Sequence, residues 1–191
     1  MRKVRLIFAG LWIAAGTVAS YGQGNLVRNG SFEDLRATWV DTTCNYMSLF
    51  AGAKTIPGWT VVPGTINEVV WAKTLTCDNH TAANRTFFLD ITGFGGDSPN
   101  GGVQQTLHNL IPGQQYIFVM DVVTIGTLPL VTVGTTAVAL HAGTPIIKGS
   151  DTWTPEIGVF VAQSANPVLT IQNQAGGQQI NFIDNVVVRP R

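Results

Sequence analysis

Hydrophobic and polar residues alternate in short runs along most of the chain after residue 24. The alternation is clearest in 116–121 (YIFVMD) and 180–184 (INFID). No window of a dozen residues carries apolar side chains at the three-and-four spacing of a helix, so the pattern predicts strands. We expect them at 59–62, 67–71, 86–92, 102–107, 115–124, 131–140, 157–162, 168–173 and 180–188.

Turn-forming dipeptides separate these runs. They include Pro57-Gly58, Asn100-Gly101, Pro112-Gly113 and Gly176-Gly177. Many short strands divided by such turns are typical of two antiparallel sheets packed face to face. The sequence therefore predicts an all-β protein, an antiparallel β-sandwich with one domain spanning 24–191.

The first 23 residues have the layout of a secretory signal peptide. Arg2, Lys3 and Arg5 precede an apolar run at 6–15, and small residues follow. The run is too short for a comfortable membrane span, and no second one follows. We expect 1–23 to be removed and the remaining chain to be secreted, extracellular or periplasmic, without a transmembrane segment.

Charge argues against a nucleic-acid partner. The chain has 11 basic and 11 acidic residues, and three of the basic ones precede residue 6, which leaves 8 against 11 in 24–191, or net −3. The remaining Lys and Arg residues are scattered, whereas nucleic-acid binding requires a basic patch or stripe.

Two cysteines, Cys44 and Cys77, follow the leader. An isolated pair in an oxidising compartment more often forms a disulfide than two free thiols. Zinc would need about four ligands, which three dispersed histidines do not complete. The sequence predicts a Cys44–Cys77 disulfide.

Four segments occur in an order that resembles a known group. They are NLVRNGSFED, IPGWTVVPGTINEVVW, FLDITGFGGDSPNGGVQQTLHNLIPGQQYIFVMDV and LTIQNQ…INFIDNVVV. The chain resembles the exported galactose-binding-like jelly rolls of the domain of unknown function 642 group and of bacterial choice-of-anchor proteins. Carbohydrate-binding modules of families 4, 9 and 22 are more distant relatives. The resemblance implies a β-jelly roll associated with polysaccharide or extracellular matrix. The chain departs from it at 37–54, which looks like a local elaboration, and in lacking the C-terminal sorting segment of the bacterial proteins.

No catalytic constellation is evident. The three histidines lie in different segments, and neither G-x-S-x-G nor H-E-x-x-H occurs. The glycine runs at 93–96 and 101–102 neither precede a helical pattern nor carry a P-loop lysine. We expect a protein that is not an enzyme.

Aromatic residues give the better indication of a binding site. Aromatic planes can stack on the apolar faces of sugar rings while amides bind hydroxyls. Most large aromatics of a sandwich are core residues, and we expect Trp59 and Trp153 to be so. The remaining candidates for a ligand site are Trp39, Tyr46, Trp71, Phe94 and Asn100.

The resemblance also implies a structural calcium ion where the first strand meets the last. The matching positions are Ser31, Glu33 and Asp184, which offer the oxygen ligands that calcium prefers. The alternative is that Glu33 pairs with Arg28 or Arg36 and that Asp184 caps a turn.

Taken together, these features predict a secreted, non-catalytic module that binds polysaccharide or cell-wall glycan. The alternative is a structural or adhesive cell-envelope protein without a sugar site, because this type of sandwich hosts many functions.

Overall fold

The computed structural model describes residues 24–35, 39–41, 44–63, 68–93, 100–174 and 180–191, and the predicted signal peptide lies outside them. These residues form strands and turns and no helix, so none of them forms a helix that could cross a membrane. The strands are β1 (Tyr46–Leu49), β2 (Thr60–Val61), β3 (Val69–Lys73), β4 (Phe87–Asp90), β5 (Gly102–Thr106), β6 (Gln115–Ile125), β7 (Leu130–Val133), β8 (Thr136–Ala137), β9 (Leu140–Ala142), β10 (Ile146–Lys148), β11 (Asp151–Val161), β12 (Val168–Gln172) and β13 (Ile180–Pro190).

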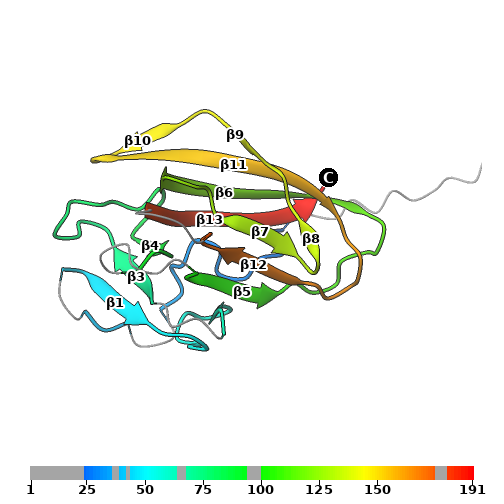
Figure 1. The fold of residues 1–191 in the computed structure, drawn as a ribbon, viewed down its shortest axis with the longest axis horizontal. Coiled ribbons are helices and arrows are strands. Elements are labelled where there is room, and N and C mark those ends of the chain that lie inside the picture. The colour runs from blue at the N-terminus through cyan, green and yellow to red at the C-terminus, as the bar shows by residue number, and fades with distance from the viewer. Residues whose placement is uncertain (1–23, 36–38, 42–43, 64–67, 94–99, 175–179) are drawn as a thin grey trace, which may run out of the picture.

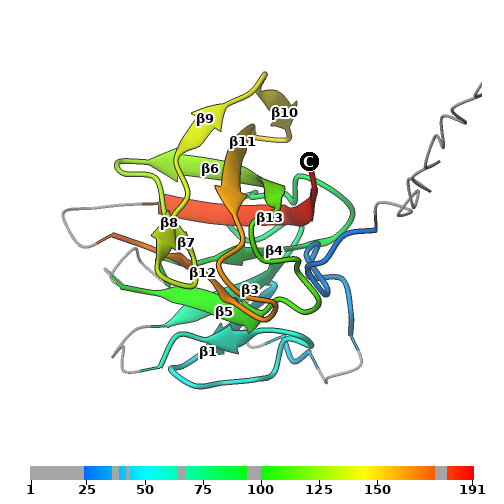
Figure 2. The same cartoon turned by 90° about the vertical axis from the view of Figure 1, so that its right-hand side faces the viewer.

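The strands form two antiparallel sheets that pack face to face (Figure 1). The larger sheet has the order β1-β3-β4-β13-β6-β11-β10, and β9 also pairs with β11. The smaller sheet has the order β2-β5-β12-β7-β8. Strands β9 and β10 lie at the opposite end of the larger sheet from β1 (Figure 2). The predicted all-β sandwich is therefore confirmed.

Three strand predictions differ from the structure. The run 131–140 is interrupted at Gly134, whose φ of +61° suits the turn between β7 and β8. Strand β11 starts at Asp151, well before the predicted 157. Strands β1 and β10 were not predicted, because β1 is only four residues long and all three residues of β10 are exposed at the edge of the sheet.

The main hydrophobic core lies between the two sheets. Strand β6 shows why, because its even-numbered residues Tyr116, Phe118, Met120 and Val122 are buried while their neighbours are more exposed. This period of two places alternate side chains on opposite faces of a sheet. Trp59 is 2% exposed in this core and donates Nε1–H to the Asn29 carbonyl, as expected of a core residue.

A second, smaller core covers the outer face of the larger sheet. It contains Val70 and Ala72 of β3, Phe88 of β4, Phe182 of β13 and Trp153 of β11, together with Ala82 and Ala83. The two alanines belong to the connection between β3 and β4. Trp153 is fully buried, which confirms its predicted packing role.

The first described segment pairs with the last strand. Leu26 N–H donates to the Val188 carbonyl and Val186 N–H donates to the Gly30 carbonyl, both at 2.8 Å. Gly30 is required here, since a Cβ atom would lie 2.0 Å from the Val186 carbonyl oxygen. This contact joins the two ends of the described chain.

Candidate functional site

Two of the residues proposed for calcium, Glu33 and Asp184, lie beside one backbone segment, 84–87. Glu33 Oε1 accepts hydrogen bonds from the N–H groups of Thr86 and Phe87 at 2.8 and 2.7 Å. Asp184 Oδ2 accepts the Asn84 N–H at 3.0 Å. Ser31 is half-buried in the turn that precedes Phe32. Two carboxylates far apart in sequence therefore fix the loop that enters β4.

The surroundings of Asp184 disfavour the ionised form of its carboxyl group. Burial raises the pKa of Asp184 to about 8, the N–H groups of Asn84 and Asn185 lower it, and the charges of Asp121 and Glu33 raise it further. A bound cation would balance these charges in place of a proton. Among the described residues, however, no three His, Cys, Asp or Glu side chains converge as metal ligands. The calcium ion therefore remains a prediction.

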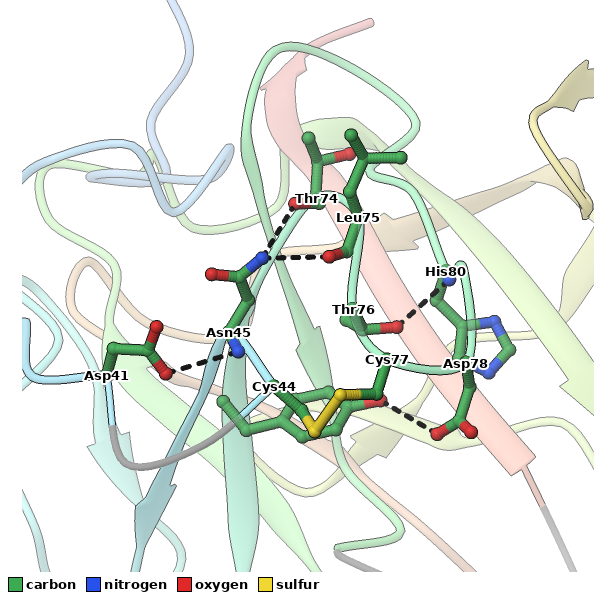
Figure 3. The surroundings of a disulfide bond; sticks show 10 residues. Asp41, Cys44, Asn45, Thr74, Leu75, Thr76, Cys77, Asp78 and His80 are labelled. Atoms are coloured by element: carbon green, nitrogen blue, oxygen red, sulfur yellow. Dashed lines mark hydrogen bonds between the residues drawn. A yellow bond between two sulfur atoms is a disulfide. The ribbon is translucent and has the colours of Figure 1, made fainter.

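The predicted disulfide between Cys44 and Cys77 is confirmed, with the two Cα atoms 4.9 Å apart (Figure 3). It joins Cys44, two residues before β1, to the segment 74–83, which follows β3. Asn45 strengthens the same junction, because its Nδ2 donates to the Leu75 carbonyl at 2.8 Å (Figure 3). One end of the 74–83 segment is thus covalently fixed.

The other end of the 74–83 segment is bound by the buried carboxylate of Asp151. His80 Nδ1 lies 2.8 Å from Asp151 Oδ1, and the Thr81 N–H donates to Oδ2 at 2.7 Å. Trp153 Nε1–H donates to the Thr81 carbonyl at 3.0 Å. The His80 ring also packs edge-on against Phe182, with 4.6 Å between ring centroids. The segment therefore covers the second core and is held at both ends.

Trp71 is not an exposed ligand residue, and that expectation is corrected. Its side chain is fully buried in the main core and its Nε1–H donates to the Phe32 carbonyl at 3.1 Å. It lies on the inward face of β3, between Val70 and Ala72, which lie on the outer face. No surface of the ring is available for stacking.

Trp39 is half-buried, with Phe87 and Lys73 beside its ring. The ring packs edge-on against Phe87, and Lys73 Nζ lies over it, 5.8 Å from the ring centroid. Its Nε1–H donates to the Trp71 carbonyl at 3.3 Å. A sugar that stacked on the face below Lys73 would have to displace that side chain.

Tyr46 lies on the outer face of the larger sheet, opposite Ala72. Its hydroxyl donates to Asp78 Oδ2 at 3.4 Å. Burial raises the pKa of Tyr46, a bond to Thr76 lowers it, and the nearby charges of Asp78 and Asp90 raise it. The ring is half-buried and is thus only partly available to a ligand.

The two other candidates precede β5 in the sequence. Asn100 is exposed two residues before β5, and its carbonyl accepts Gln172 Nε2–H at 3.0 Å. Phe94 lies outside the described residues. The structure therefore does not bring the four described candidates together on one surface.

Asp90, on the outer face of β4, is an unusual acid that the sequence did not single out. Its Oδ1 accepts hydrogen bonds from the N–H and the hydroxyl of Thr92. Burial raises its pKa to about 7, the two bonds from Thr92 and the charge of His80 lower it, and Glu68 raises it. Near neutral pH this carboxyl exchanges a proton.

A polar surface that only strand register assembles lies on the outer face of the smaller sheet. Thr60, Gln104, Thr170 and Thr132 stand side by side on β2, β5, β12 and β7, in register. They point outward because their strand neighbours are core residues. All four are half-buried, and Gln172 lies in the next row. The signal in the sequence is the alternation of Thr or Gln with Val, Leu or Ile in LVTV and VLTIQ.

This polar row carries no formal charge. The strands that form the sheet read TV, GVQQT, LVTV, TA and VLTIQ, without Asp, Glu, Lys or Arg. Its side chains offer hydroxyl groups, which donate and accept, and amides, which present both donors and an acceptor. The surface is therefore suited to a neutral ligand rich in hydroxyl groups.

No protein-family model and no curated protein matches the chain. Among solved structures, one described as "CBM4 structure and function" is 12% identical, covers 86% of this chain and 99% of its own, and has a TM-score of 0.38. The enzymatically active domain of bacteriophage CBA120 tailspike protein 4 is 15% identical over 87% of this chain and 21% of its own, with a TM-score of 0.38. At such values neither similarity bears on function.

Proposed function

We propose that the protein is an exported, non-catalytic module that binds neutral polysaccharide on the outer face of its smaller sheet. The observation that carries this proposal is the uncharged row of Thr60, Gln104, Thr170 and Thr132 across four adjacent strands. The disulfide is consistent with export, because such bonds persist in oxidising compartments.

The row is well arranged for a linear chain of sugars. Adjacent strands lie about 4.8 Å apart, so the row presents hydrogen-bonding groups at regular intervals across the sheet. A flat surface with fixed backbone loses little entropy when it binds, since its side chains are already half-buried and short. A polysaccharide lying across the strands would meet several of these groups at once.

Binding at this surface is expected to be weak for each sugar unit. Each neutral hydrogen bond contributes about 0.5–1.5 kcal/mol net, and the described part of this face offers no aromatic platform. Four or five such contacts sum to about 2–7.5 kcal/mol, so the dissociation constant is expected to be about 1 mM or weaker once association costs of about 4 kcal/mol or more are included. Long chains are therefore expected to bind better than short oligosaccharides.

Affinity electrophoresis tests the proposal. Native gels that contain mixed-linkage glucan, xyloglucan or galactomannan should retard the protein, whereas a gel with polygalacturonate should not. Gln104→Ala and Thr170→Val should reduce the retardation at least about fivefold, since each removes contacts of about 1 kcal/mol. Thr152→Val, the same change as at Thr170 but on the larger sheet, is the matched control.

Two outcomes would contradict the proposal. Retardation by none of the neutral polysaccharides would favour the alternative of a structural or adhesive envelope protein. Retardation that survives both substitutions would place the sugar site elsewhere, with Tyr46 and Trp39 as the next candidates.

The proposal includes a structural calcium ion bound by Glu33 and Asp184 with backbone oxygens near Ser31. The support is the buried carboxyl of Asp184, raised in pKa beside Asp121 and Glu33, which a cation would stabilise. Calcium should raise the melting temperature and a chelator should lower it, because a ligand of the native state stabilises that state. An unchanged midpoint in about 10 mM calcium would exclude a site of the affinity usual for extracellular modules.

A further inference from the structure

The outer face of the larger sheet carries an exposed aliphatic patch. Its members come from β6, β11 and β13, the long strands at the centre of the sheet. Ile157, Val159 and Val161 of β11 are 41%, 43% and 38% exposed. The patch consists of Ile117, Val119, Ile157, Val159, Val161 and Val187.

Strand register makes these side chains one continuous surface. Val119 lies opposite Ile157 on one side and opposite Val187 on the other. Ile117 lies opposite Val159. A bulge in β13 between Asp184 and Val187 adds one residue and keeps Val187 in this row. The patch therefore spans three neighbouring strands without a polar side chain between them.

The sequence of these strands indicates a face that is covered. In β6 the stretch Tyr116 to Met120 is apolar at every position, not only at the inward ones. Strands buried on both faces read as such continuous runs, whereas a strand with one solvated face alternates. Contiguous exposed apolar patches on soluble proteins mark interaction surfaces.

We propose that this patch binds a second copy of the same chain. Charges at the two ends of the patch favour that occupant. Asp121 lies at one end, beyond Val119, and Arg189 lies at the other, paired in register with Ile117. A two-fold axis perpendicular to the strands would place Asp121 of each copy opposite Arg189 of the other, as an isologous interface requires. The two β-branched faces would pack as sheets do in a sandwich, about 10 Å apart.

The dimer is expected to be weak. Six aliphatic side chains are fewer than the 20–30 residues per partner of a standard interface. We therefore expect a dissociation constant of about 10–100 µM. The interface is independent of the proposed glycan surface, which lies on the other sheet, so a dimer would present two glycan surfaces outward.

Sedimentation velocity of the purified chain from about 5 µM to about 1 mM tests the inference. The wild-type protein should shift from monomer to dimer over this range. Val159→Lys should raise the dissociation constant at least about tenfold, because each copy would then place a charge in the apolar interface. Val168→Lys is the matched control, since Val168 is 39% exposed on the outer face of the smaller sheet. It should dimerise as the wild type does.

Two further variants keep the test decisive. Val159→Thr, which conserves shape, should weaken the dimer without endangering the fold. Arg189→Glu should weaken it most at low salt, because it places an acid opposite Asp121 of the second copy. A chain that stays monomeric up to about 1 mM, or equal effects of Val159→Lys and Val168→Lys, would overturn the inference.

Discussion

Replacing Asp90 by Asn should make the free energy of unfolding less dependent on pH. Asp90 Oδ1 accepts both hydrogen bonds from Thr92, and an asparagine can keep them with its own oxygen. The substitution removes a carboxyl whose pKa burial raises from 3.8 to about 7. The variant therefore isolates the cost of ionising this side chain in the folded state.

The sign follows from linkage. The folded-state pKa lies above the unfolded one, so the carboxyl favours folding most below about pH 4 and loses that contribution as the pH rises through 7. The difference between the folded and unfolded pKa of Asp90 corresponds to a change of at most about 4 kcal/mol in the free energy of unfolding. Because the side chain is incompletely buried, solvent screening reduces this change to about 2–4 kcal/mol. The free energy of unfolding of Asp90→Asn minus that of the wild type should therefore be larger above pH 7 than at pH 4, by most of this change.

Urea unfolding of both proteins at about pH 4, 5, 6, 7 and 8 measures this difference. Asp184, with a pKa of about 8, titrates in both proteins and cancels in the comparison. Asp78→Asn, which alters an exposed carboxylate on the neighbouring 74–83 segment, is the matched control. If the free energies of unfolding of the wild type and Asp90→Asn differ by the same amount at pH 4 and at pH 8, the reasoning is refuted.

Three further outcomes are expected. Replacing both cysteines by alanine should lower the free energy of unfolding by about 3–4 kcal/mol, because the disulfide closes a loop between residues 33 positions apart. Amide hydrogen exchange should become faster first in 74–83, and an increase spread evenly over the chain would contradict a local role of the disulfide. Trp71→Ala should lower the free energy of unfolding by about 3–5 kcal/mol, because Trp71 is a buried core aromatic. Trp71→Phe should leave the retardation by glycan gels unchanged, and a selective loss of binding in this variant would restore Trp71 as a ligand residue. Glu156 is buried, and its Oε2 has no hydrogen-bond partner among the described residues. Burial raises the pKa of this carboxyl, so Glu156→Gln should stabilise the protein more at pH 8 than at pH 4, as urea unfolding at the two values would show.

Strand positions could largely be predicted, because a half-buried strand imposes a period of two on its own sequence. The alternation in β6 and β13 predicted both strands nearly to their ends. The short edge strands β1 and β10 were missed because they bury little, and a strand that buries little leaves no hydrophobic pattern. The disulfide needed only the presence of two cysteines in a chain predicted to be exported.

The candidate sites depended on which face a residue occupies. Trp71 belongs to VVWAK, in which every residue but the lysine is buried, so periodicity could not show that the tryptophan faces the main core. Asp90 acquires its raised pKa from burial in the folded chain, which neither composition nor periodicity shows.

By itself, the sequence determined the class of fold and the disulfide, because each follows from local period or from composition. The tertiary structure alone decided which polar residues meet. Thr60, Gln104, Thr170 and Thr132 are scattered over more than 100 residues and become one row only through the strand order β2-β5-β12-β7. The same holds for the aliphatic patch, which depends on the register of β6, β11 and β13 and on a single bulge. A shift of one residue would turn either surface inward, since successive side chains of a strand face opposite sides of the sheet.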